Sequence, residues 1–210
     1  MYVRRNIRNR VSAFGLVAAL GLTACSTTDD SSDTTATGAA GSATGATAAD
    51  ASQLLSAHGM SGMDDVVEII DHLDRLGGSE RPQDLIASVR PDQLVLSSGG
   101  DEVSIAIPDD AFYLSIAPYV NQTHECYNHS LTTCTGELAS TEVEVQIVDE
   151  TNDEVLVEKT VTTFENGFVG FWLPRDIKGT IKITHDGRSG EADIATGTDD
   201  PTCLTTVRLA

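Results

Sequence analysis

The spacing of apolar residues changes near Gln93, and this change constrains the fold more than any other feature of the chain. Before it, apolar residues recur with the period of an amphipathic helix. After it, they alternate with polar residues in short runs, as in half-buried strands. Short strands separated by turn residues are typical of antiparallel sheets. We therefore expect an α+β protein with a small helical N-terminal region, residues 51–100, and an antiparallel β-sheet or sandwich-like C-terminal domain, residues 101–210.

The strongest helix signal covers Asp64–Leu76, where six apolar residues have helical spacing and acidic residues occupy the first turn. Gly77 and Gly78 are expected to end this helix. A shorter helix is predicted around Leu54 and Leu55, and Pro82 suits the first turn of another that runs to Ala87. In the C-terminal region, the pair Asp186-Gly187 separates two alternating runs and predicts a β-hairpin.

The first residues of the chain have the features of an export signal. A basic segment ends at Arg10, and an apolar segment of about a dozen residues follows, shorter than the roughly 20 needed to span a bilayer. The sequence Leu22-Thr23-Ala24-Cys25 resembles the lipobox of bacterial lipoproteins. We predict a signal peptide over 1–24 and a lipidated Cys25, which would anchor the protein at the extracytoplasmic face of the bacterial cell membrane. The alternative is an ordinary cleaved signal with an incidental cysteine.

Residues 25–50 contain almost only Ser, Thr, Ala, Gly and Asp after the cysteine, and are expected to form a disordered tether. The whole chain has 13 basic and 32 acidic residues, a formal net charge of −19. Four of the basic residues lie in the signal, so the mature protein is more acidic still. Because nucleic-acid binding depends on neutralising phosphates, we expect no nucleic-acid partner.

Residues 118–138 interrupt the alternating pattern and are longer than an ordinary connection. They contain His124, Cys126, His129 and Cys134, and a further cysteine, Cys203, lies near the C-terminus. With Cys25 lipidated, the folded part keeps three thiols, an odd number for an exported protein. These five residues are the candidate metal ligands.

The cysteine count alone leaves several arrangements open. Cys126 and Cys134 could form a disulfide with Cys203 buried, or Cys203 could pair with either loop cysteine. Alternatively, three thiolates, or two with an imidazole, would form a soft site that favours Cu(I), while imidazole also suits Cu(II). The spacing of Cys126 and Cys134 does not match a zinc finger or ribbon. A disulfide beside a third thiol could also exchange electrons.

Enzyme classes with recognisable motifs are not indicated. No Cys-x-x-Cys motif opens a helix, so the usual arrangement of a thiol–disulfide oxidoreductase is missing. No nucleophile, base and orienting acid of a hydrolase stand out. The main alternative to metal binding is a cell-surface binding module whose cysteines only staple the fold.

Residues 112–134 run from Phe112 through His124-Glu125-Cys126 to Cys134, and residues 167–203 include Trp172-Leu173-Pro174-Arg175 and end in Asp200-Pro201-Thr202-Cys203. Both stretches resemble the CueP family of exported bacterial copper-resistance proteins. The likeness covers roughly residues 51–210. It implies that Cys126, Cys134 and Cys203 bind copper. Because His124 and His129 flank Cys126 at short range, we expect one of them to assist as a ligand or as the first contact of Cu(II). The likeness also implies copper sequestration outside the cytoplasm, cysteine-dependent reduction of Cu(II) to Cu(I), copper supply to an exported superoxide dismutase, and a homodimer.

Overall fold

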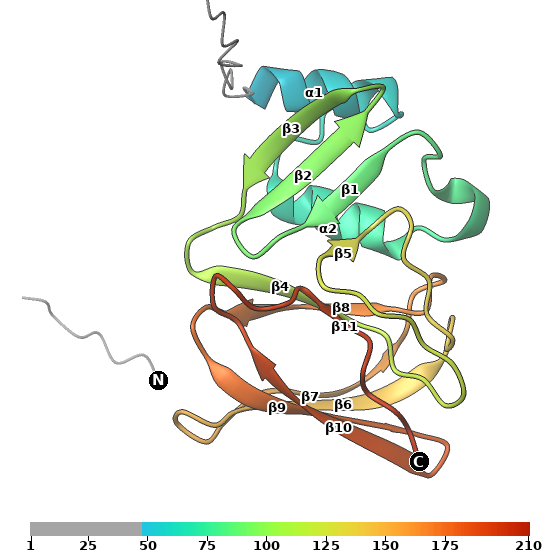
Figure 1. Ribbon diagram of the computed structural model, residues 1–210, viewed down its shortest axis with the longest axis vertical. Coiled ribbons are helices and arrows are strands. Elements are labelled where there is room, and N and C mark those ends of the chain that lie inside the picture. The colour runs from blue at the N-terminus through green and yellow to red at the C-terminus, as the bar shows by residue number, and fades with distance from the viewer. Residues whose placement is uncertain (1–47) are drawn as a thin grey trace, which may run out of the picture. The chain divides into compact units, whose positions relative to one another are not determined.

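The computed structural model describes residues 48–210 (Figure 1). The predicted signal peptide, the predicted lipidation of Cys25 and most of the predicted tether lie outside these residues. The described part is mostly antiparallel β-sheet with two α-helices, α1 (Ala48–Ala57) and α2 (Val66–Arg75), which confirms the α+β class. Among the described residues, no helix is both long and apolar enough to cross a membrane.

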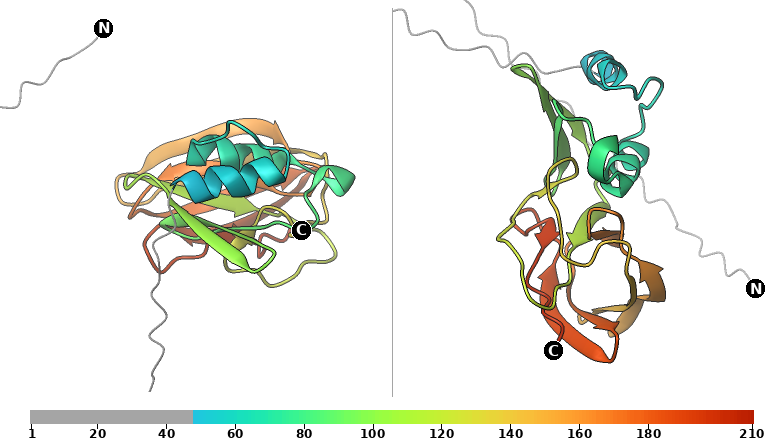
Figure 2. Two further views of the ribbon diagram at one scale, coloured as in Figure 1. Left: turned by 90° about the horizontal axis from the view of Figure 1, so that it is seen from above. Right: turned by 90° about the vertical axis from the view of Figure 1, so that its right-hand side faces the viewer.

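The N-terminal part combines the two helices with one sheet. Strands β1 (Ile86–Val89), β2 (Gln93–Ser98) and β3 (Asp101–Ala106) form an antiparallel meander, and β5 (His129–Ser130) extends it in the order β3-β2-β1-β5. Both helices lie against one face of this sheet (Figures 1 and 2). Helix α2 begins where the Asp65 side chain accepts hydrogen bonds from the backbone N–H groups of Val67 and Glu68. Its buried stripe of Ile69, Ile70 and Leu73 packs into a core shared with β1 and β2.

Two further sheets form the C-terminal part. One has the order β10-β9-β6-β7 and the other the order β11-β4-β8. Apolar side chains from both sheets, among them Phe112, Val145 and Ile181, belong to one buried cluster, as their alternation along the strands requires. The strand bounds are β4 (Ala111–Ile116), β6 (Glu142–Asp149), β7 (Glu154–Thr162), β8 (Val169–Pro174), β9 (Lys178–His185), β10 (Arg188–Ala195) and β11 (Cys203–Leu204).

Two local predictions have opposite outcomes. The hairpin at Asp186-Gly187 is confirmed: it joins β9 to β10, and both turn residues have positive φ, 49° and 74°, as a two-residue hairpin turn requires. The short helix from Pro82 to Ala87 is wrong. A 3₁₀ turn occupies Gly78–Glu80, and β1 begins at Ile86 because Ala87 and Val89 are buried between two neighbouring strands. The predicted helical region therefore also contains strands.

The long segment 118–138 leaves the C-terminal sheets and returns to the N-terminal one. It does so through β5, where Ser130 pairs with Ser88 and His129 pairs with Val89 of β1. The C-terminal segment enters the same region through β11, which pairs in parallel with β4. The two segments are also joined directly, since the backbone N–H of Cys203 donates to the carbonyl of Tyr127. This topology brings cysteines far apart in sequence to one place.

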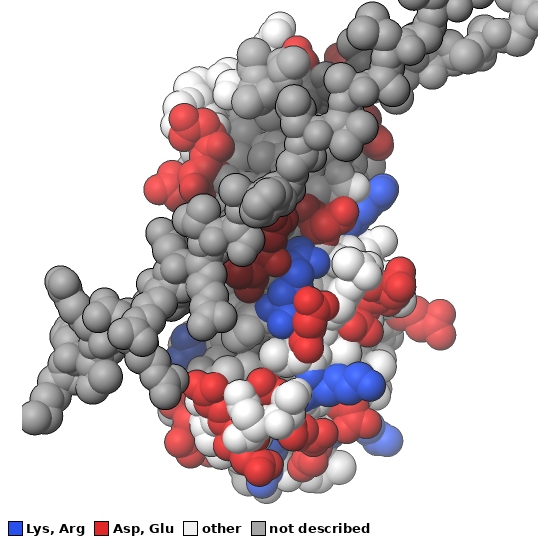
Figure 3. All heavy atoms as spheres, turned by 90° about the vertical axis from the view of Figure 1, so that its left-hand side faces the viewer, with Lys and Arg blue, Asp and Glu red and all other residues white. Residues whose placement is uncertain are grey.

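On one face of the described chain, acidic side chains are spread over the visible surface rather than gathered at one point (Figure 3). On the face shown in Figure 3, carboxylates cover much of the visible part of the described chain, with basic side chains between them. Such a surface attracts cations diffusely and does not by itself define a binding site.

Candidate metal centre

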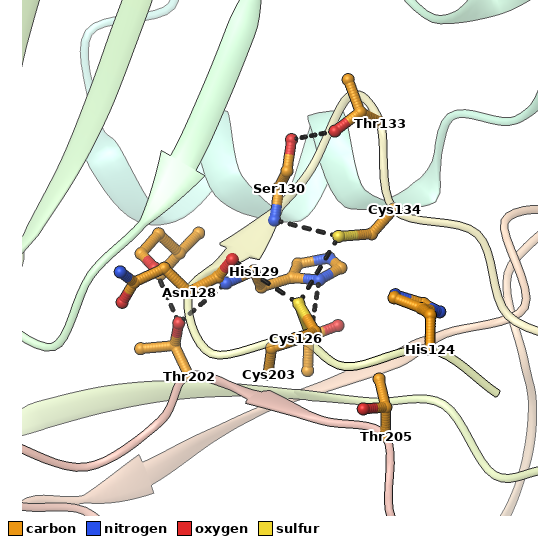
Figure 4. The surroundings of a disulfide bond; sticks show 12 residues. His124, Cys126, Asn128, His129, Ser130, Thr133, Cys134, Thr202, Cys203 and Thr205 are labelled. Atoms are coloured by element: carbon orange, nitrogen blue, oxygen red, sulfur yellow. Dashed lines mark hydrogen bonds between the residues drawn. A yellow bond between two sulfur atoms is a disulfide. The ribbon is translucent and has the colours of Figure 1, made fainter.

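Four side chains with metal-binding chemistry meet beside β5 and β11. The sulfur atoms of Cys126, Cys134 and Cys203 and a ring nitrogen of His129 all lie within 4.8 Å of one another (Figure 4). Cys203 and His129 are buried, while Cys126 and Cys134 are partly exposed. The structure therefore brings together four of the five residues predicted from the sequence. That they bind metal stays a prediction at this point.

Cys126 and Cys203 form a disulfide, with their Cα atoms 5.6 Å apart, and Cys134 is a free thiol. This pairing is one of the alternatives left open by the sequence. The Sγ of Cys134 lies 3.6 Å from the Sγ of Cys126, about the contact distance of two sulfur atoms. The backbone N–H of Ser130 points at the Cys134 sulfur from 3.4 Å. The cluster thus consists of one oxidised pair and one adjacent thiol.

Backbone contacts hold the Cys134 turn in place. The N–H of Cys134 donates to the carbonyl of Ser130 at 3.0 Å, which closes a turn directly after β5. The Cys134 carbonyl in turn accepts a hydrogen bond from Nη1 of Arg81 at 2.7 Å. Arg81 is buried and also donates from Nε to the carbonyl of Leu76. The guanidinium therefore connects the residue that follows α2 to the loop that contains Cys134.

His129 is fully buried, and both of its ring nitrogens have a neighbouring polar or sulfur atom. Its Nε2 lies 2.7 Å from Oδ1 of Asp74, and its Nδ1 faces the sulfur of Cys203 at 3.7 Å. The ring packs on Phe168, with centroids 4.5 Å apart. The backbone N–H of His129 donates to Oγ1 of Thr202, the residue before Cys203. These contacts fix both the position and the orientation of the imidazole.

Asp74, on α2, is a buried carboxylate with a complete set of donors. Oδ2 accepts from the hydroxyls of Tyr113 and Ser115, at 2.6 and 3.0 Å, and Oδ1 accepts from Nδ2 of Asn166 at 3.1 Å in addition to His129. Burial alone would raise the pKa of Asp74, but the charge and hydrogen bond of His129, together with the two hydroxyls, hold it below its usual value. The carboxylate therefore stays ionised inside the protein.

The same pair controls the charge near the sulfurs. Burial opposes a charge on His129, but the charge and hydrogen bond of Asp74 outweigh it, and the neighbouring Cys134 adds to this effect, so the pKa of His129 rises to about 9. For Cys134, burial would raise the pKa, but the hydrogen bond and charge of His129, the N–H of Ser130 and the charge of Arg81 lower it. A Cys134 thiolate is favoured, and thiolate is the form that binds metal.

His124 is not part of this cluster. It lies in an exposed stretch and touches the edge of Phe168, with ring centroids 6.2 Å apart (Figure 4). The carboxylate of Glu137 organises the preceding turn. It accepts hydrogen bonds from the backbone and side-chain amides of Asn121 and from the N–H of Val120, which lower the pKa of Glu137 to about 2. His124 therefore borders the site without reaching the sulfurs.

The sequence reasoning missed three residues that support the site: Asp74, Arg81 and Asn166. A signal for Asp74 was present. It occupies the position eight residues after Val66 and four after Ile70, on the apolar stripe of α2. A charged residue on such a stripe is costly to bury and therefore points to a partner inside the protein.

Comparison with known proteins places these features in a family. The family model described as periplasmic copper-binding protein CueP matches residues 68–208. Among solved structures, a crystal structure of S.CueP matches with a TM-score of 0.71 and 38% sequence identity, covering 76% of this chain and 97% of that chain. No curated protein matches. All four clustered residues and Asp74 lie inside the matched segment.

Proposed function

Since the chain belongs to the CueP family of periplasmic copper-binding proteins, we propose that its Cys–His cluster binds copper outside the cytoplasm. In this proposal the thiolates of Cys126, Cys134 and Cys203 hold one Cu(I) after the disulfide is reduced. Soft sulfur ligands favour Cu(I) over harder ions. Copper is cargo here, bound and released rather than kept as a permanent cofactor.

The observation that carries the proposal is the triangular arrangement of the sulfurs. A metal held by three thiolates at about 2.3 Å, the distance typical of metal–thiolate bonds, keeps the sulfurs roughly 4 Å apart. The separation of 3.6 Å between Cys126 and Cys134 is close to this spacing, and no separation in the cluster exceeds 4.8 Å. Breaking the Cys126–Cys203 bond frees the third corner of the triangle.

The same geometry disfavours a dedicated thiol–disulfide oxidoreductase. Attack of Cys134 on the disulfide needs the three sulfurs nearly in line, and a disulfide bond of about 2 Å added to 3.6 Å would put Cys134 and Cys203 beyond 5 Å apart. Their actual separation is at most 4.8 Å, so the sulfurs form a bent group. The arrangement suits a shared ion better than sulfur-to-sulfur exchange.

Reduction of Cu(II) is a second step that this cluster supports. The thiolates of Cys126 and Cys203 each give one electron to a Cu(II) ion and join as a disulfide. Two Cu(I) ions form, and the protons of the two thiols pass to solvent beforehand, when the thiols ionise to thiolates. Cys134 and His129 stay available as ligands beside the new disulfide. The expected result is two Cu(I) per disulfide formed, measured with a chromophoric Cu(I) chelator and by mass spectrometry of the disulfide.

The test of copper binding uses the full chain with Cys25→Ser, so that the remaining thiols are those of the cluster. Reduced, metal-free protein is titrated with Cu(I) without oxygen against a competing chromophoric chelator. We expect one tightly bound Cu(I) per chain, and a loss of at least tenfold in affinity for Cys126→Ser, Cys134→Ser and Cys203→Ser. His129→Asn and His124→Asn form a matched pair, of which only the first should weaken binding. Full affinity in all three cysteine variants would end the proposal.

The disulfide itself favours the alternative of a stapled surface module without a metal role. That alternative predicts a disulfide that resists mild reductants and one reactive thiol at all times. Copper binding instead predicts three reactive thiols after reduction and their protection by Cu(I). A thiol count before and after adding Cu(I) therefore separates the two functions.

We also infer from the lipobox-like sequence that Cys25 carries a lipid and holds the protein at the outer face of the cell membrane. The expected result is that native protein partitions into detergent and Cys25→Ser protein does not. Two implications of the family resemblance, an exported superoxide dismutase as copper acceptor and a homodimer, stay predictions. Copper transfer in a mixture of the purified proteins and sedimentation of the loaded protein test them.

A further inference from the structure

We propose that Asp74 is a positioning residue for copper binding, which fixes the His129 imidazole so that Nδ1, and not Nε2, is offered to the three sulfurs. The inference rests on the proposed copper-binding function. It adds a residue from α2, more than fifty positions before His129 in the sequence, to a site otherwise built from β5, its adjoining loops and β11.

The first step is the hydrogen-bond count at Asp74. Four side-chain donors surround the carboxylate, with His129 and Asn166 at Oδ1 and Tyr113 and Ser115 at Oδ2. Asn166 also donates to the Asp74 backbone carbonyl at 2.6 Å, which orients its amide with nitrogen toward Asp74. An ionised carboxylate only accepts hydrogen bonds. The 2.7 Å contact therefore requires a hydrogen on Nε2 of His129.

The second step follows from the chemistry of imidazole. A charged ring carries a hydrogen on both nitrogens, and a metal ion can bind only after one of these protons passes to solvent. Because Asp74 keeps the hydrogen of Nε2, the proton that leaves is the one on Nδ1, and the free lone pair in the ring plane is then on Nδ1. That atom lies 3.7 Å from the Cys203 sulfur and belongs to the group within 4.8 Å. Phe168 covers the ring, and His129 is fully buried, so the imidazole cannot turn the other nitrogen toward the sulfurs without breaking its contact with Asp74.

The third step concerns the size of the effect. A carboxylate that accepts the outer N–H of a metal-binding histidine orients the ring and makes its free nitrogen a stronger donor. Loss of such a partner typically lowers metal affinity 10- to 100-fold. The donors to Asp74 come from β4, from the turn before β8 and from β5. The position of α2 therefore determines, through the Asp74 carboxylate, where Nδ1 of His129 lies.

The direct test needs no substitution in the cluster or in the hydrogen-bond network around Asp74. The full chain with Cys25→Ser, labelled with ¹⁵N at histidine, is reduced and studied by NMR without metal and with one equivalent of Cu(I). Because Cu(I) is diamagnetic, both nitrogens of His129 can be observed. We expect Nε2 to stay protonated in both states and the Nδ1 resonance to move on loading. A shift of Nε2 with loss of its proton would overturn the proposal.

The second test compares two substitutions on the same helix. Asp74→Asn removes the charge with little change in shape. Asp71→Asn is the matched control, because Asp71 accepts a hydrogen bond from Trp172 at 3.0 Å and does not contact His129. We expect a 10- to 100-fold loss of Cu(I) affinity for Asp74→Asn and less than a twofold change for Asp71→Asn. Equal affinities in a folded Asp74→Asn protein would contradict the inference.

The outcomes separate this inference from the proposed function. If the unsubstituted protein binds no Cu(I), the function fails, and the Nε2 proton in the metal-free protein still tests how Asp74 holds the ring. If the unsubstituted protein binds Cu(I) and Asp74→Asn binds it equally well, only the positioning role fails. If Asp74→Asn does not fold, the NMR measurement on the unsubstituted protein decides the question.

Discussion

Reducing the Cys126–Cys203 disulfide in the metal-free protein should lower the free energy of unfolding by about 4.5 kcal/mol at 25 °C, on the loop-closure treatment of cross-links. The magnitude follows from the sequence separation of 77 residues that the bond closes. The cross-link acts on the unfolded chain, whose freedom it restricts. The folded state should persist after reduction, because Leu204, Val207 and Leu209 keep the C-terminal segment buried in the β core.

Urea unfolding followed by fluorescence measures this difference. Trp172 is the only tryptophan and packs against Tyr113 with ring centroids 4.8 Å apart, so it reports on the region between the helices and β4. Oxidised and reduced proteins are compared, with Cys134→Ser as the control that removes a sulfur but keeps the disulfide. The control should change stability by less than about 1 kcal/mol, as expected for a partly exposed side chain.

Copper gives the prediction a second part. A ligand that binds only the folded state stabilises it in proportion to the logarithm of its concentration over its dissociation constant. Cu(I) should therefore restore much of the stability lost on reduction, and should do so less effectively in Cys134→Ser. A loss of less than 1 kcal/mol on reduction would refute the loop-closure reasoning. Recovery of stability that is equal with and without the Cys134 sulfur would refute the shared-ion geometry.

Three further predictions concern the buried network and its surroundings. His129→Asn should cost roughly 3–5 kcal/mol in urea unfolding, because it leaves the Asp74 charge buried without its partner. The stability that His129 contributes should be complete below pH 6.5, the ordinary pKa of histidine, and should be lost as the pH rises through about 9. The stability that Asp74 contributes should be lost only in acid, because the pKa of Asp74 is lowered. Unfolding curves of native and His129→Asn proteins at pH 6 and pH 10 should therefore converge at the higher pH. Gly136→Ala should cost roughly 1–3 kcal/mol in the same assay, because a Cβ would lie 2.6 Å from the Gly167 carbonyl.

The elements that could be predicted from sequence are those whose signal is local and long. In helix α2 the apolar residues keep helical spacing over several turns. The hairpin between β9 and β10 contains Asp186-Gly187, a pair that strongly favours a two-residue hairpin turn. Strand β1 has four residues, too few to distinguish a period of two from a helical turn, and Pro82 nearby suited a helix start. Its strand character comes from pairing with β2 on one side and with β5 on the other, and β5 lies far from β1 in the sequence.

For the site, the sequence indicates which residue types have metal-binding chemistry, but it does not indicate which of them lie together. Residue type and crowding along the chain identified the cysteines and both histidines of the long loop. They could not choose between His124 and His129, because both flank Cys126 at short range. The choice is made by strand pairing: His129 lies in β5 and pairs with buried Val89, while His124 remains in an exposed stretch. Nor could the cysteine count select the Cys126–Cys203 pair, which depends on the parallel pairing of β11 with β4.

The N-terminal region therefore contributes to the proposed metal site. Strand β1 supplies the partner that turns His129 inward, and α2 supplies the carboxylate that holds its ring. Arg81 holds the Cys134 turn through the backbone carbonyl, so residues before Gln93 constrain both His129 and Cys134. The three cysteines come from the long mid-chain loop and from the C-terminal segment. An ion bound by the proposed site would then link the two parts of the fold, and its release would loosen both, so copper occupancy would be coupled to the packing of α2.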